Sequence, residues 1–353
     1  MIPVLTSIRT AVGVIASAAI SLWCIAAVTW APLGPSWRTA SAALALGVLC
    51  VGAMVAGRRA ARARTRWIAR LALAAAWGAT GAWFVLVPPP AEADWLPECA
   101  RAPTVHWGGG SINIRGIRDF DYRTSDTDAE PRWIDRAFEL DRVRTIDLFF
   151  SSWGPTLICH TFVSFGFERA DGGMEHIAVS IEVRKRRGQS YSAIGGMFRQ
   201  FTLAYVWATE RDVVGVRAKF RGEDLRRYRL AMPPEEVRVL FERYAIETET
   251  LARSPRWYNA VTQSCGVDIL RTAWGDRMPL FPPLRMLLNG TWEERAWEEG
   301  RLDRTRSFEA VRAEADITAD ARAAGADDFG AAIRRRDVVM GVRGPEPTAA
   351  ASP

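Results

Sequence analysis

The stretch His160-Thr-Phe-Val-Ser-Phe-Gly-Phe167 alternates in a way that is typical of a β-strand with one face buried. Residues 176–183 form a second β-rich run, and the Asp- and Gly-rich segment 169–174 between the two runs predicts a turn. The sequence therefore predicts a β-hairpin that begins at a histidine.

The position of the turn predicts which residues of this hairpin face one another. If the turn centres near Asp171, paired residue numbers sum to about 342, which sets Glu182 opposite His160. Directly opposed side chains share a face within about 5 Å, so Glu182 can hold the imidazole in one tautomer. A slip of one pair would bring Ser180 or Arg184 there instead. His176 reaches His160 only if the hairpin pairs very differently.

A cysteine follows His160 by 105 residues, in Gln263-Ser-Cys265-Gly-Val-Asp-Ile-Leu270. Ser264 is a candidate helix cap, so Cys265 lies in the first turn of a predicted helix over 264–273. Free backbone N–H groups and the helix dipole lower the pKa of a thiol there, and a neighbouring imidazolium lowers it further. Gly266 removes side-chain bulk beside the sulfur, and its N–H could bind an oxyanion. A lone His and Cys can also be packing residues.

Three apolar segments precede this region. Residues 11–30, 40–57 and 71–87 carry no charge. The first is long enough to cross a bilayer core of roughly 30 Å, and the other two are near the short end of the spanning range. The loop between the second and third segments contains six arginines in residues 58–70, which indicates the cytoplasmic side. Everything after Pro88 is therefore expected outside the cytoplasm. A cleaved signal peptide is the alternative for the first segment.

The charge balance supports this partition. The chain has 46 Lys and Arg against 40 Asp and Glu, so the net charge of +6 equals the six arginines of the predicted cytoplasmic loop. The remainder is formally neutral, which argues against nucleic-acid binding. Among the five cysteines, those at 24 and 50 lie in predicted spans, which leaves an odd number outside. A bridge between Cys99 and Cys159 would leave Cys265 as the free thiol.

The domain organisation follows from these segments. We expect a membrane anchor over 1–90, a Pro-rich linker over 91–104, a folded domain over 105–337, and a disordered Pro/Ala/Gly-rich tail over 338–353. The fold class is α+β, an antiparallel sheet followed by helices. Further strands are predicted at 111–122, 144–150 and 203–206, and a further helix is predicted over 233–251.

Other polar residues have weaker patterns. Arg184 and Arg211 are candidates for binding a phosphate headgroup because guanidinium groups match phosphate geometry, although structural ion pairs with neighbouring acids are the simpler interpretation. His106 and His176 are not at metal-ligand spacing from His160, so neither a metal site nor a cofactor is expected.

Several separated motifs together resemble one bacterial family. They are His160-Thr-Phe-Val-Ser-Phe, Ser180-Ile-Glu-Val-Arg-Lys185, Phe198-Arg-Gln-Phe201 with Glu210-Arg-Asp212, Pro255-Arg-Trp-Tyr-Asn259, and Gly300-Arg-Leu-Asp303 with Ser307-Phe-Glu309. In this order, over about 106–336, they resemble the Lnb-type periplasmic domain family. That family is similar to a permuted NlpC-type and lecithin:retinol acyltransferase-like papain fold, in which His precedes Cys.

The resemblance implies Cys265 as nucleophile and His160 as base. It also implies transfer of a fatty acyl chain from a membrane phospholipid to the N-terminal amine of bacterial lipoproteins, at the periplasmic side of the inner membrane. The chain departs from the family pattern at the nucleophile, where Asn-Cys-Thr is usual and Ser264-Cys265-Gly266 stands here.

Two other function classes remain open on the sequence. A cell-wall cysteine peptidase or amidase could use the same pair of residues, although a wall hydrolase needs no multispan anchor. A noncatalytic envelope binding module would leave Cys265 replaceable. Apolar residues near the site, such as Phe162 and Ile269, suit an acyl groove and a core equally well.

Overall fold

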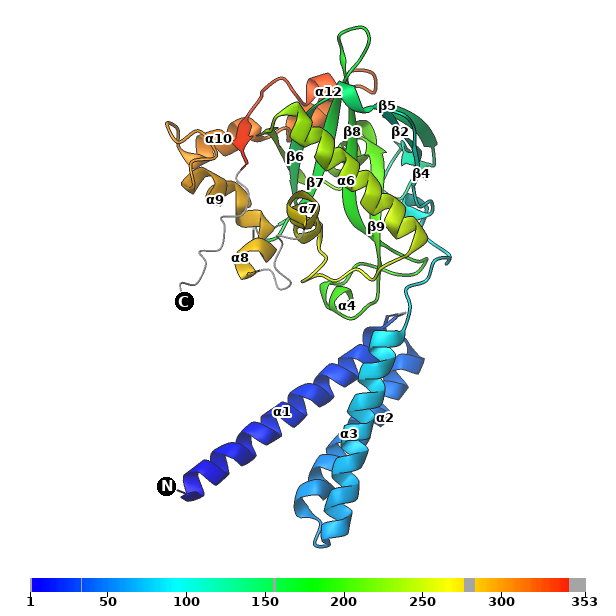
Figure 1. Cartoon of the computed structure of the whole chain (residues 1–353), viewed down its shortest axis with the longest axis vertical. Coiled ribbons are helices and arrows are strands. Elements are labelled where there is room, and N and C mark those ends of the chain that lie inside the picture. The colour runs from blue at the N-terminus through cyan, green and yellow to red at the C-terminus, as the bar shows by residue number, and fades with distance from the viewer. Residues whose placement is uncertain (1, 33, 155–156, 276–282, 343–353) are drawn as a thin grey trace. The chain divides into compact units, whose positions relative to one another are not determined.

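The structure is a computed structural model that describes residues 2–32, 34–154, 157–275 and 283–342 (Figure 1). The chain divides into two compact units. The first unit contains Met1–Pro90 together with Gly188–Thr202 and Arg256–Ala260, and the second contains the rest. The predicted disordered segment after Gly344 lies outside the described residues.

The helices of eight or more residues are α1 (Ile2–Trp30), α2 (Trp37–Arg59), α3 (Ala63–Leu86), α5 (Glu210–Lys219), α6 (Pro234–Arg253), α7 (Cys265–Trp274) and α10 (Phe308–Ala315). The shorter ones are α4 (Ala193–Met197), α8 (Leu284–Leu287), α9 (Trp292–Glu298), α11 (Thr318–Ala323), α12 (Phe329–Ala332), and the 3-10 turns Pro97–Cys99, Leu140–Arg142 and Asn289–Thr291.

The strands are β1 (Thr104–Trp107), β2 (Ser111–Arg118), β3 (Asp121–Tyr122), β4 (Ala129–Glu130), β5 (Trp133–Glu139), β6 (Val143–Ser152), β7 (His160–Glu168), β8 (Met174–Arg184), β9 (Thr202–Thr209), β10 (Asp224–Ala231) and β11 (Val339–Gly341).

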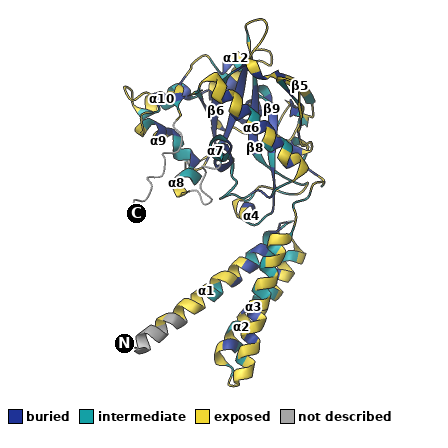
Figure 2. Ribbon diagram, in the orientation of Figure 1, coloured by how far each residue is buried: buried dark blue, intermediate teal, exposed yellow. Residues whose placement is uncertain are grey.

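Three helices of the first unit are long and apolar enough to cross a membrane. The candidate spans are Ala11–Trp30, Trp37–Arg59 and Ala63–Leu86, and an 18-residue window within each has a mean hydropathy of 2.2, 2.1 and 1.3 respectively. Most of their side chains are exposed in Figure 2, as expected of apolar helices whose outer surface is covered by lipid. The three predicted spans are therefore confirmed as helices of spanning length. α2 begins with a capping box in which Ser36 and Thr39 satisfy each other's backbone N–H groups.

A mixed sheet forms the centre of the second unit. Within the described residues its strand order is β1-β2-β9-β8-β7-β6-β10-β11, and β5 pairs with β2. Most neighbouring strands are antiparallel, whereas β2 with β9 and β10 with β11 are parallel. The unit is thus α+β, as predicted, with a mixed sheet in place of the expected antiparallel one.

The central hairpin has the predicted register. Phe162 pairs with Ser180 and Gly166 pairs with His176, so paired numbers sum to 342. The turn at 169–173 is consistent with this register, because the Arg169 N–H donates to the Gly173 carbonyl at 2.8 Å across it. Two residues further outward on each strand, Glu182 Oε1 lies 3.1 Å from His160 Nε2.

Helices cover both faces of the sheet. On one face, Phe241 of α6 lies against aromatic rings of the strands, including Phe138, Phe165, Phe167 and Trp207. On the other face, α5, α11 and α12 pack over a second apolar cluster that contains Phe149, Phe162 and Phe329. Figure 2 shows the central strands as buried.

Two predicted boundaries need correction. The expected linker 91–104 is folded against the sheet: Leu96 N–H donates to the Lys185 carbonyl at 2.9 Å, and Trp95 and Cys99 are buried. The expected disordered tail contains an ordered strand, because Val339–Gly341 pair in parallel with β10. Both segments satisfy backbone groups at edges of the fold, which local composition does not reveal.

Buried ion pairs tie separate elements together. Arg118 of β2 donates to the Asp212 carboxylate of α5 from Nη2 at 2.7 Å, and both side chains are buried. The Phe120 N–H donates to the same carboxylate at 2.7 Å. These contacts compensate the negative charge of the buried Asp212 carboxylate where β2 meets α5.

We expect Arg118→Met to lower the free energy of unfolding by about 3–5 kcal/mol, because it leaves the buried Asp212 carboxylate without its cation. Arg115→Met on the same strand is the control, since Arg115 and Asp135 are exposed partners 4.0 Å apart, and such pairs contribute about 0–1 kcal/mol. Urea titration of the detergent-purified protein measures both variants. Equal effects of the two variants would contradict the prediction.

Candidate active site

Cys265 is the first residue of α7. The hydroxyl of Ser264 accepts a hydrogen bond from the Val267 N–H at 3.5 Å, so the predicted cap is present. The helix packs against β7 and β8, which places its N-terminus at the end of the sheet where His160 begins β7. The thiol therefore lies beside the free backbone N–H groups of a helix end.

The imidazole of His160 is held by the opposite strand. Its Nε2 lies 2.7 Å from the Ser180 hydroxyl and 3.1 Å from Glu182 Oε1. The Ser180 hydroxyl in turn donates to Glu182 Oε1 at 2.7 Å. Because these partners occupy Nε2, the other ring nitrogen is left for the thiol.

The electrostatics favour an ionised thiol. Burial alone would raise the pKa of the Cys265 thiol, but the adjacent His160 and hydrogen bonds from His160 and Thr161 outweigh burial and lower that pKa. Burial opposes the charge of His160, yet Glu182 and Cys265 raise its pKa to about 9. Both shifts act in the same direction, because each favours the pair of a protonated imidazole and a thiolate over the neutral pair.

Arg217 supports the carboxylate from the neighbouring helix. Its Nη2 donates to Glu182 Oε1 at 2.7 Å, its Nη1 donates to the Val213 carbonyl at 2.8 Å, and the side chain is buried. Burial would raise the pKa of Glu182, but His160, Arg217 and the Ser180 hydroxyl hold it well below its usual value. Arg217 also lies 3.7 Å from Glu223, which accepts from the Ser151 hydroxyl.

Asn289 lies close to the sulfur, and the sequence analysis did not identify it. Its Oδ1 accepts from the Cys159 N–H at 3.1 Å, and its Nδ2 donates to the Cys159 carbonyl at 2.7 Å. The same Nδ2 lies 3.8 Å from the sulfur of Cys265. The amide thus clamps the peptide before His160 and presents a donor to the thiol. No sequence pattern marks it, because it follows Cys265 by 24 residues in a 3-10 turn of its own.

Gly266 allows this close approach. A Cβ at Gly266 would lie 3.1 Å from the Trp292 ring and 3.3 Å from the Asn289 Cβ. Any side chain there would press on the residue that clamps the Cys159 peptide. The structure therefore gives Gly266 a packing role beside the thiol, while the oxyanion role of its N–H stays a prediction.

His160, Glu182 and Cys265 lie in a segment of the chain that is similar to a known protein family. Residues 129–284 match the Lnb N-terminal periplasmic domain family. This segment is similar to that family. No curated protein and no solved structure matches the chain.

The Lnb match contains His160, Glu182 and Cys265. Asn289 lies beyond its end, so the structure extends the site past the matched segment. With three helices of spanning length before it, the chain is a membrane protein with a periplasmic domain. The resemblance on which the sequence analysis relied is confirmed for this segment.

Arg184 and Arg211 contact residues of the second compact unit that precede the matched segment. Arg184 donates to the Cys99 and Ala100 carbonyls at 2.9 and 2.8 Å and stacks over Trp95. Arg211 pairs with Asp119 at 2.9 Å. The structure brings neither guanidinium to the thiol, which favours the structural interpretation of both.

The remaining candidates also lie elsewhere. His176 pairs with Gly166 toward the other end of the hairpin, where burial lowers the pKa of its imidazole. Cys99 and Cys159 are both free thiols, so the considered bridge is not formed. Burial raises the pKa of Cys99 to about 11 and raises that of Cys159 as well. The pKa of the Cys265 thiol is shifted in the opposite direction, downward.

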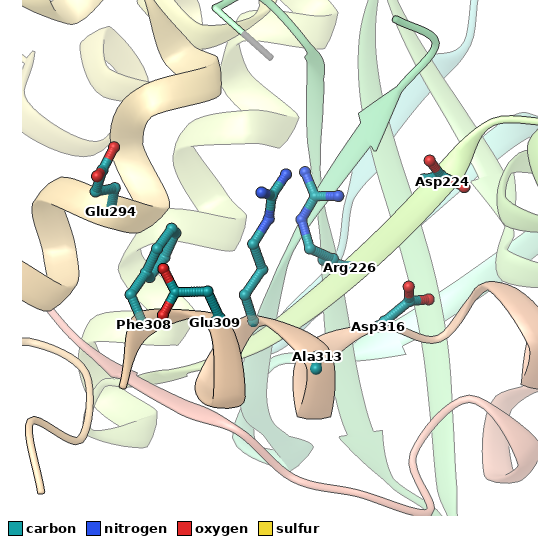
Figure 3. A pocket seen from close by; sticks show the side chains of 8 residues that line it. Asp224, Arg226, Glu294, Phe308, Glu309, Ala313 and Asp316 are labelled. Carbon is teal, nitrogen blue, oxygen red and sulfur yellow. The ribbon is translucent and has the colours of Figure 1, made fainter. Parts of the chain in front are cut away.

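A polar hollow of about 600 Å³ lies along α10 of the same unit (Figure 3). Its lining residues are Asp224, Arg226, Glu294, Phe308, Glu309, Arg312, Ala313 and Asp316. Arg226 is paired with the buried Glu293 at 2.6 Å. The lining contains neither the thiol nor its base, so this hollow is separate from the candidate active site. The described residues contain no His, Cys, Asp and Glu group suited to a metal ion.

We expect the alkylation of Cys265 by iodoacetamide to titrate below the usual thiol pKa of about 8.5, because the reactive thiolate is stabilised by protonated His160. Glu182→Gln should move the midpoint upward. Loss of the carboxylate lowers the pKa of His160, and a neutral imidazole no longer stabilises the thiolate. Peptide mass spectrometry across a pH series measures the rate.

Glu175→Gln is the matched control for this titration, since Glu175 lies on the same strand and pairs with the exposed Arg136. Its midpoint should equal that of the wild type. An unchanged midpoint in Glu182→Gln would show that Glu182 does not set the charge of His160.

Proposed function

We propose that this protein is a membrane-anchored thiol acyltransferase that moves a fatty acyl chain from a phospholipid to the N-terminal amine of bacterial lipoproteins. The observation that carries the proposal is the Cys265 and His160 pair, with its lowered thiol pKa, in a periplasmic domain whose chain has three helices of spanning length. The Lnb family match supports a role in lipoprotein processing.

In the first half-reaction the Cys265 thiolate attacks an ester carbonyl of the phospholipid. A C–S bond forms, and the negative charge moves to the carbonyl oxygen. When the ester C–O bond breaks, protonated His160 gives its proton to the departing glycerol oxygen. The products are an acyl-thioester on Cys265 and a lysophospholipid.

In the second half-reaction the amine of the lipoprotein attacks the thioester carbonyl. An N–C bond forms, the C–S bond breaks, and His160 takes the proton that the nitrogen loses. An amide is released, and the thiolate and imidazolium are restored. No cofactor is needed, because the thioester itself activates the acyl group.

The oxyanion of each half-reaction needs hydrogen-bond donors close to the sulfur. Asn289 Nδ2, 3.8 Å from the sulfur, and the backbone N–H groups at the start of α7 are the donors that this proposal uses. We place the reaction at the periplasmic face of the inner membrane, where phospholipid and lipoprotein are both present.

Incubation of the detergent-purified protein with phospholipid should add the mass of one acyl chain, and hydroxylamine should remove it. Cys265→Ala should show no adduct, because the nucleophile is gone. Intact-mass spectrometry measures both. The absence of an adduct on wild-type protein with a free, alkylatable Cys265 would overturn the acyltransferase proposal.

The same preparation tests the peptidase alternative. Release of amine from peptidoglycan stem peptides, without an adduct from phospholipid, would favour the cell-wall peptidase or amidase. The absence of both activities in folded wild-type protein would favour a noncatalytic binding module.

Asn289→Ala should slow formation of the acyl-enzyme by about 10²–10³-fold, as for the loss of one oxyanion donor in other acyl-transfer enzymes. Alkylation by iodoacetamide builds no oxyanion, so its rate at Cys265 should fall much less. Rapid-quench mass spectrometry gives the first rate, and the iodoacetamide titration gives the second. Equal losses in both rates would assign Asn289 to positioning of the thiol alone.

A further inference from the structure

The loop between β8 and β9 belongs to the same compact unit as the spanning helices. This loop, Gly188–Thr202, contains α4. Arg199 at its end has a positive φ of 56°, and its Nη1 donates to the Phe84 carbonyl and, at 2.9 Å, to that of Val85. These carbonyls lie at the C-terminus of α3, where a helix has no partners of its own for them and favours a cation.

Aromatic side chains continue this contact into the helices. Phe198 lies 6.4 Å from Trp23 of α1 and 6.5 Å from Phe84 of α3, measured between ring centroids. Trp23 precedes the end of α1 by seven residues, or about 10 Å of helix, and Phe84 precedes the end of α3 by two residues, or about 3 Å. Phe198 therefore contacts α1 and α3 at positions that precede the C-terminal ends of both spanning helices.

Small residues let the rest of the loop come close as well. A Cβ at Gly195 would lie 3.1 Å from the Trp30 ring at the end of α1. Gly196 is similarly close to Tyr258 and Ala260, and its carbonyl accepts from the Ala260 N–H at 3.2 Å. The Trp257 indole donates to the Val87 carbonyl at 3.0 Å. The loop is thus anchored on the helix ends by specific contacts.

The outer side of the loop is apolar and has no charge. Residues 188–198 contain no Asp, Glu, Lys or Arg, and Tyr191, Ile194 and Met197 are 52%, 50% and 40% exposed. Exposed apolar side chains at the ends of spanning helices are at the depth of the boundary between headgroups and acyl chains, where such side chains are stabilised by lipid.

We propose that Gly188–Thr202 is a membrane-inserted loop whose exposed apolar side chains lie in the outer leaflet of the bilayer. The occupant of this face is phospholipid. The contact with Trp23 and Phe84, inside the spanning segments, makes the apolar face continuous with the lipid-covered surface of the helices. The loop needs no acyltransferase chemistry for this, so the inference stands apart from the proposed function.

A photoreactive amino acid at position 194 tests the proposal in full-length protein reconstituted into phospholipid nanodiscs. Ile246 on α6 is the matched control, because it is also a helical isoleucine and is 49% exposed. After irradiation, mass spectrometry should find several-fold more lipid adduct at 194 than at 246. Fragment spectra should place the adduct on the acyl chain or the glycerol, which reports the depth of the side chain.

Three results would overturn the proposal. These are equal lipid adducts at both positions, adducts at 194 that carry only the headgroup, and adducts at 194 on a second copy of the protein without lipid. The same photoreactive amino acid in place of Met197 tests the same apolar face at a second position. Unaltered alkylation of Cys265 in each variant shows that the protein is folded.

Discussion

The contact between Arg217 and Glu182 is the constraint on which the candidate site depends. A carboxylate at this position is needed to raise the pKa of His160, but burial opposes its charge. Arg217 supplies the compensating cation at 2.7 Å, and α5 holds that cation in place through the Val213 carbonyl. The sheet therefore supplies the His and the Glu, the helix on one face supplies the Arg, and α7 supplies the thiol.

Patterns that depend on neighbouring residues could be predicted from the sequence. The turn at Asp171 predicted the hairpin register, and that register placed Glu182 opposite His160. Ser264 gave the start of α7 because a helix cap is local chemistry. The spanning helices needed only length and apolarity. In each case a few consecutive residues contained the whole physical cause.

Features whose cause lies far along the chain could not be predicted. β10 reads Asp224-Leu-Arg-Arg-Tyr-Arg229, which is too charged for a central strand, yet Arg227 is buried because Asp147 of β6 meets it at 2.9 Å. Asn289 likewise acts on a peptide that lies 130 residues earlier. Charged and amide side chains become interior residues only when a partner is present, and a single sequence does not show which partner the fold will bring.

Arg217 also limits how firmly His160 holds its proton. Glu182 raises the pKa of the imidazole, whereas Arg217 lowers it. In the proposed reaction, with Glu182 alone the imidazolium would be stabilised so strongly that it would release its proton slowly to the leaving alkoxide. A general acid is most effective when its pKa lies near the working pH, so a carboxylate half-neutralised by a buried guanidinium suits a base that must both accept and return a proton. The same argument explains why Arg217 is buried: in water its effect on the imidazole would be screened.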